Sequence, residues 1–144
     1  MGRIFNLDDI ELISYVEATR EFYRTQSRII DDCECEDCKF YYHIFSRKNL
    51  ELYSYLSNLG VDIRKNLDSE PTGVWCCRDE NEDLIFCEHN YQVIGELRAN
   101  TENEFIYIKN ELGYVVKAYF EQLEQNIISV QLSIKQIENA QQAI

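Results

Sequence analysis

The stretch ISVQLSIK, residues 128–135, decides which fold the rest of the chain has to fit. Its apolar and polar residues alternate, so an extended backbone would present one apolar face and one polar face. This alternation predicts a half-buried β-strand. Glutamine and glutamate are good helix formers, however, and a single long helix over residues 112–140 therefore stays open as an alternative.

Upstream of this stretch, several other runs have the character of strands. Those expected to be strands are residues 73–77, residues 84–89, residues 91–97 after a corner at Asn90, and a fourth run around Phe105 and Tyr107. The polar run 78–83 predicts a turn between the first two strands. Gly95 has no side chain, which predicts that another segment packs closely against the third strand. Residues 112–124 differ, because their apolar residues recur every four positions and predict a helix.

The N-terminal half shows helical spacing almost throughout. Residues 6–24 predict an amphipathic helix, and the apolar pair at 29–30 predicts a brief strand or extended turn. A second helix is expected to open within the cysteine cluster and to carry residues 40–45. A third is expected from a cap at Asn49 to Gly60, whose left-handed backbone would end it.

Helices followed by a series of short strands are typical of an α+β fold. We therefore expect a single α+β domain over residues 1–144, with N-terminal helices packed on one antiparallel sheet of about four to five strands. Residues 136–144 are polar and are expected to form a frayed tail or a short helix.

The composition excludes several classes of protein. The chain has 144 residues with 26 Asp and Glu against 14 Lys and Arg, a formal net charge of −12, yet 45% of its residues are hydrophobic, which is too many for a disordered acidic chain. No apolar run approaches the roughly 20 residues that a membrane helix needs. The N-terminus lacks the apolar core of a signal peptide, so we expect a cytoplasmic protein. Acids outnumber bases in both halves, which disfavours direct binding of nucleic acid but leaves binding of a basic protein open.

Six cysteines make metal binding the first chemistry to consider, because stable disulfides are rare in the cytosol. Two cysteines with two residues between them, as in Cys35-x2-Cys38, have the spacing of a zinc knuckle, and a Cys-x-His pair on one strand face could complete a tetrahedral site. The candidate zinc ligands are Cys33, Cys35, Cys38, Cys87 and His89. The alternative is that the cysteines are small buried hydrophobes and that the chain has no cofactor. Cys87 and His89 also resemble a hydrolase's nucleophile and base, but no orienting group or oxyanion hole accompanies them, so we expect no enzyme.

Two runs of acids are the remaining feature of the sequence. Either run is explained by a solvated loop, and the second would also suit a hairpin turn. Both could instead form an electronegative edge that docks a basic protein, with tyrosines as aromatic anchors. The candidate partner-binding residues are Asp31, Asp32, Glu34, Glu36 and Asp37 in the first run, and Asp79, Glu80, Glu82 and Asp83 in the second.

One order of segments over about residues 30–135 resembles a known group of proteins. The segment CEDCKF at 35–40 is followed by a leucine-bearing helix closed by LGVD at 59–62, a hairpin, YQVIG at 91–95 and an alternating strand near the C-terminus. This order resembles small acidic proteins of Gram-positive bacteria that look like immunity proteins of polymorphic toxins, including type VII-secreted ones. The resemblance implies a cytoplasmic protein that binds a toxin and blocks it.

We therefore expect a protein-binding module, an immunity protein that occludes a basic toxin by steric and electrostatic block. One alternative is an inhibitor from a phage or mobile element that imitates nucleic acid, which the net charge of −12 would suit. Another is a small domain stabilised by zinc. The sequence does not indicate an oligomeric state.

Overall fold

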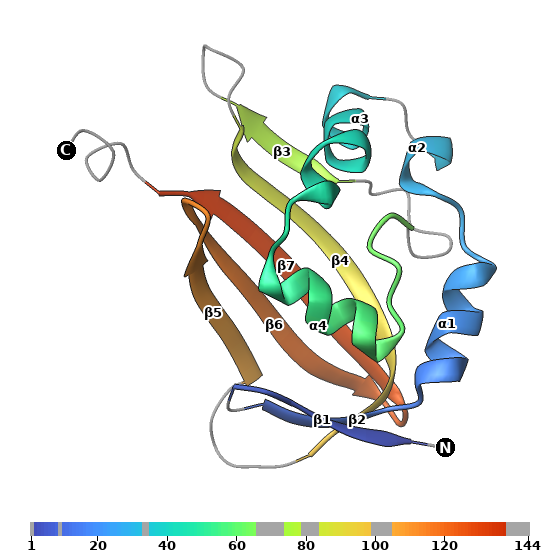
Figure 1. Ribbon diagram of the computed structural model, residues 1–144. Helices are drawn as coiled ribbons and strands as arrows, with labels where there is room; N and C mark the ends of the chain where they lie inside the picture. Colours follow the sequence, from blue (N-terminus) through green and yellow to red (C-terminus); the bar gives the residue numbers. More distant parts are fainter. Residues whose placement is uncertain are drawn as a thin grey trace.

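The protein has an α+β fold in which a β-hairpin precedes the helices and five further strands follow them (Figure 1). The structure, a computed structural model, describes residues 2–8, 10–32, 35–65, 74–78, 84–98 and 105–137. The helices are α1 (Val16–Arg24), α2 (Ile29–Asp32), α3 (Glu36–His43), the short 3₁₀ helix η1 (Phe45–Arg47) and α4 (Glu51–Leu59). The strands are β1 (Arg3–Leu7), β2 (Ile10–Ser14), β3 (Trp75–Arg78), β4 (Leu84–Leu97), β5 (Phe105–Glu111), β6 (Tyr114–Glu124) and β7 (Ile127–Gln136).

The strands form one antiparallel sheet in the order β1-β2-β4-β7-β6-β5, and β3 pairs with the first part of β4. The sheet thus has more strands than the four to five expected, although the α+β class is confirmed. In Figure 1, α4 crosses in front of the long strands, and the β1–β2 hairpin runs across one end of them. No helix in the described ranges is both long and apolar enough to span a membrane.

The strand expected at residues 128–135 is confirmed and lies at the centre of the core. Ile128, Val130, Leu132 and Ile134 are each at most 1% exposed, while the polar residues between them point to the other face. β7 lies between β4 and β6 over most of its length, so both of its edges are paired. Burial of one face and pairing of both edges explain why the period of two prevails over helix propensity here.

The helix expected over residues 6–24 is wrong in its first half. Arg3–Leu7 and Ile10–Ser14 form the paired strands β1 and β2, and helix begins only at Val16. Leu7, Ile10 and Leu12 are buried, and β2 alternates in burial from Ile10 to Ser14, which is the period of a strand. The pairing of β2 with β4 overrides the weaker helical pattern, because a strand beside a partner buries the same side chains and satisfies its backbone.

The helix expected over residues 112–124 is also wrong, and so is the longer helix over 112–140. Residues 114–124 form β6, which pairs with β5 on one side and with β7 on the other. Val116 and Phe120, which suggested a helix, are four residues apart. Four is an even number, so both also fall on one face of a strand, together with the buried Ala118 between them.

Two smaller expectations also fail. Asn90 does not form a corner, because β4 runs unbroken through it and pairs with β7 from Phe86 to Ile94. The pair at 29–30 is not extended, because it opens the single-turn helix α2. Strands at residues 84–97 and at Phe105–Glu111 are confirmed apart from this missing corner, and β3 covers the C-terminal part of the first expected strand.

The helix closed by Gly60 is confirmed, but its N-terminal cap is not the expected one. Gly60 has a φ of 104°, and a side chain there would approach the backbone oxygen of Val16 to 2.7 Å. At the other end, the backbone N–H of Glu51 donates to both carboxylate oxygens of Glu111, at 3.0 and 2.8 Å. A carboxylate sixty residues away therefore does the work expected of Asn49, which no local pattern could indicate.

Candidate functional site

α1 is fastened to an otherwise unpaired edge of β4. β3 pairs with β4 up to Glu88 and β2 pairs from Gly95 onward, so no strand among the described residues pairs with the edge between them. The Tyr23 hydroxyl fills this gap by accepting from the N–H of Gln92 and donating to its carbonyl, both at 2.8 Å. Thr19 Oγ1 accepts from the backbone N–H of Ile94 at 3.1 Å. The inner face of α1 is thereby fixed, and its arginines are left on the outside.

Gly95 behaves as the sequence predicted. A Cβ there would lie 2.0 Å from the backbone oxygen of Ile13, so only glycine lets β2 approach β4 this closely. This close approach joins the N-terminal hairpin, and through it α1, to the rest of the sheet.

The first acid run lies on α2 and α3, where its members have different environments. Asp31 accepts two hydrogen bonds from Arg28, at 2.8 and 3.0 Å, and these hold the pKa of its carboxyl below the usual value. Glu36 is exposed in the first turn of α3. Asp37 is half-buried, and its carboxylate accepts the backbone N–H of Cys76 at 3.0 Å. Asp32 ends α2, but its side chain is not described.

The hydrogen bond from Cys76 to Asp37 ties α3 to β3. β3 ends at Arg78 and β4 begins at Leu84, so in the sequence the second acid run lies between these two strands. Glu34 and the residues of that run, Asp79, Glu80, Glu82 and Asp83, themselves lie outside the described residues. We call α3 and β3, the described elements beside which the two acid runs lie in the sequence, the acidic end of the molecule.

The candidate zinc ligands lie in unlike surroundings. Cys35 is exposed, and its sulfur caps α3 by accepting the backbone N–H of Cys38 at 3.4 Å. Cys38, Cys87 and His89 are buried, and Cys87 and His89 share the inner face of β4. Within the described part of the chain, no group of three or more His, Cys, Asp or Glu side chains could hold a metal ion. Cys33 lies outside that part.

Cys87 faces Cys76 across the β3–β4 pair, and both are buried. Hydrogen bonding to Cys76 and burial raise the pKa of the Cys87 thiol far above its ordinary value. Cys76 and Cys87 therefore lie opposite each other within the hydrophobic core.

Tyrosines are found in the core as well as on the surface. Tyr41 on α3 and Tyr91 on β4 are fully buried, and their hydroxyls are hydrogen-bonded to each other. The Tyr91 hydroxyl also donates to the carbonyl of Ile63 at 2.7 Å. Burial raises the pKa of both phenols well above 10. These two rings cannot be the aromatic anchors on a docking surface that the sequence suggested.

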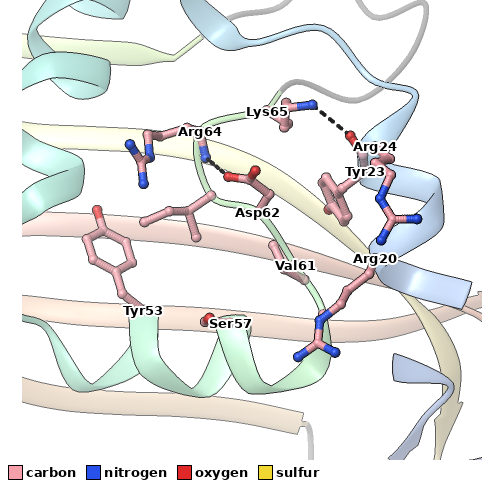
Figure 2. A pocket seen from close by; sticks show the side chains of 11 residues that line it. Arg20, Tyr23, Arg24, Tyr53, Ser57, Val61, Asp62, Arg64 and Lys65 are labelled. Atoms are coloured by element: carbon pink, nitrogen blue, oxygen red, sulfur yellow. Dashed lines mark hydrogen bonds between the residues drawn. The ribbon is translucent and has the colours of Figure 1, made fainter. Parts of the chain in front are cut away.

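The structure shows a pocket that the sequence did not indicate. It has a volume of about 520 Å³ and lies between α1, α4 and the segment of residues 60–65 (Figure 2). Its charged residues are Arg20 and Arg24 from α1, and Asp62, Arg64 and Lys65 from the segment. We call it the cationic pocket. Its bases lie in two separate pairs in a strongly acidic chain, so only the tertiary structure brings them together.

One lysine holds the walls of this pocket together. Lys65 Nζ donates to the carbonyls of Tyr23 and Gln26, at 2.9 and 3.0 Å, which binds the segment to the end of α1. Figure 2 shows Lys65 reaching toward α1, with Arg20 and Arg24 on the same side of the view and Arg64 across from them. The arginines are thus presented on a framework that Lys65 and Gly60 fix.

Comparison with protein families, with curated proteins and with solved structures finds no match to this chain. Its function has to be sought in the geometry and charge of the two surfaces, the acidic end and the cationic pocket.

Proposed function

We propose that the chain is a protein-binding module that docks a basic partner on its acidic end. The observation that supports this most is the hydrogen bond between Asp37 and the backbone of Cys76. It joins α3, which carries Glu36 and Asp37, to β3, which ends at Arg78 directly before the second acid run in the sequence. Carboxylates gathered at one end of a protein attract a basic partner and orient it before contact.

Within this proposal the acids have two roles. Asp37 is a fastener, because its carboxylate is already bonded to β3. Glu36 is exposed, and together with the second acid run it meets the partner. The partner is a basic toxin, as the resemblance to immunity proteins implies, and the bound chain blocks it by covering its surface without performing chemistry.

The test uses the product of the gene next to that of this chain, which is the natural candidate for a toxin. The association rate of the two purified proteins is measured over a range of salt concentrations. Asp79→Lys combined with Glu80→Lys is expected to slow association roughly tenfold at low salt and to flatten its salt dependence, because steering acts through the local field.

The matched control reverses the same number of charges elsewhere. Glu121 and Glu124 are exposed on β6, on a different part of the sheet, and Glu121→Lys with Glu124→Lys gives the same change in net charge. This control should slow association much less. Equal slowing by both variants, or a wild-type rate that does not respond to salt, would refute docking on the acidic end.

A further inference from the structure

Basic residues are concentrated in the cationic pocket against the trend of the whole molecule. Four of its lining residues are Arg or Lys and one is acidic, in a chain whose acids outnumber its bases by 26 to 14. A cluster of this kind creates a local positive potential that the net charge of −12 does not reveal. The potential favours an anionic ligand.

The arginines of α1 are held only by weak interactions. Arg20 pairs with Glu17 at 3.0 Å, but their side chains are 49% and 83% exposed. Arg24 pairs with Glu21, and both of these side chains are about two-thirds exposed. Ion pairs so exposed are worth about 1 kcal/mol or less. A ligand with a stronger negative charge could therefore take over both guanidinium groups at little cost.

Arg64 has no such pair. Its backbone N–H donates to the Asp62 carboxylate at 3.1 Å, and its exposed guanidinium forms no ion pair with a described residue. In Figure 2 it lies across the pocket from Arg20 and Arg24. Guanidinium groups therefore line the pocket from two sides, with the Asp62 side chain between them in this view, so only a ligand long enough to span the pocket could contact both sides.

The size and lining of the pocket indicate more than a bare ion. A volume of about 520 Å³ lies within the range of roughly 300–1,000 Å³ that is usual for small-molecule sites. Val61 and Ile63 add apolar side chains to the wall, and Ser57 adds an exposed hydroxyl. Such a lining suits a molecule that has an organic body as well as an anionic group.

We propose that the cationic pocket binds a phosphorylated small molecule of nucleotide size, with its phosphate held by the guanidinium groups of Arg20 and Arg24 and with Arg64 donating to acceptor atoms at the other end of the molecule. A phosphate monoester carries a charge of about −1.5 to −2 and three strong acceptor oxygens, so it can bond to more than one guanidinium at once. A carboxylate has one charge and two oxygens. The organic body occupies the rest of the pocket beside Val61, Ile63 and Ser57.

The probes are adenosine 5′-monophosphate, inorganic phosphate and adenosine, and titration calorimetry on the full chain gives each Kd. The monophosphate is expected to bind with a Kd below millimolar, more tightly than inorganic phosphate, and adenosine should not bind measurably. Arg64→Gln should weaken binding of the monophosphate roughly tenfold, the effect of losing one charge-assisted hydrogen bond. Arg20→Gln with Arg24→Gln should weaken it further.

Arg47→Gln is the matched control, because Arg47 is an exposed arginine in η1 outside the pocket. It makes the same change in net charge as Arg64→Gln and should leave Kd unchanged. The proposal is overturned if the monophosphate does not bind below millimolar, if adenosine binds as well as it does, or if Arg47→Gln weakens binding as much as Arg64→Gln. Circular dichroism checks that each variant is folded.

Discussion

The acidic end and the cationic pocket are built in the same way with opposite charges. At the acidic end Asp37 holds the backbone of β3, and in the pocket Lys65 holds the backbone at the end of α1. In each case one charged side chain bonds to the backbone of another element, while an adjacent residue with a charge of the same sign, Glu36 or Arg64, stays exposed. A charged residue in a cluster can therefore hold the fold together instead of binding a ligand, and its hydrogen bonds to backbone atoms distinguish the two roles.

The two surfaces differ in what joins their elements. At the pocket α1 closely approaches the end of α4, whereas at the acidic end a side chain of α3, that of Asp37, accepts a hydrogen bond from the backbone of β3. Tyr41, Tyr91 and the carbonyl of Ile63 form a buried chain of hydrogen bonds between α3 and the segment that lines the pocket. The substitutions below disturb one region at a time.

Gly60→Ala should have the largest effect. The residue would be strained at a φ of 104°, and its Cβ would lie 2.7 Å from the Val16 oxygen and 2.9 Å from Thr19 Cβ. We expect a loss of about 3 kcal/mol in the free energy of unfolding, which urea denaturation measures. Gly113→Ala is the control, because Gly113 also has a positive φ, of 83°, but its Cβ would meet nothing within 4 Å. Equal losses in the two variants would contradict the close contact between α1 and α4.

The two fasteners should differ in strength. Lys65→Met removes an ammonium group that bonds to two carbonyls and should cost about 2 kcal/mol of unfolding free energy. Asp37→Ala removes one hydrogen bond to a backbone N–H and should cost about 1 kcal/mol. Denaturant titration of both variants measures this, and a larger loss for Asp37→Ala would reverse the comparison.

The buried tyrosines should make stability fall at alkaline pH. Burial raises the pKa of Tyr41 above the ordinary value near 10, so above about pH 10 the unfolded chain loses a proton that the folded chain retains. The free energy of unfolding is therefore highest below that pH and decreases as pH rises through it. Tyr41→Phe removes one such group and should reduce the slope by up to about 1.4 kcal/mol per pH unit. Identical slopes for variant and wild type would contradict a buried phenol at this position.

The sequence predicted the fold well where local and tertiary preferences agree. The strand at 128–135 and the helix ended by Gly60 have periodicity, burial and turn chemistry that point to the same structure. The prediction from sequence failed in β6, because apolar residues four positions apart fit both the helical period and the strand period. It also failed in β2, where pairing with β4, a strand distant in sequence, determines the structure.

The candidate sites could be predicted less well, for a related reason. The acid runs are contiguous in sequence and visible there, but the role of Asp37 depends on a strand about forty residues away. The cationic pocket was missed because its bases come from α1 and from the segment at 60–65, which are adjacent only in the fold. The net charge of a chain does not reveal a cluster of bases in the fold when acids outnumber bases in the sequence around them.

Two separate surfaces of this small protein are proposed to bind ligands of opposite charge. Amide chemical shifts of the ¹⁵N-labelled chain, recorded during separate titrations with an oligolysine peptide and with adenosine 5′-monophosphate, test this claim directly. The peptide should shift amides of α3 and β3, and the nucleotide should shift amides of α1 and of residues 60–65. Shifts at one common set of amides, or none with either ligand, would contradict the account.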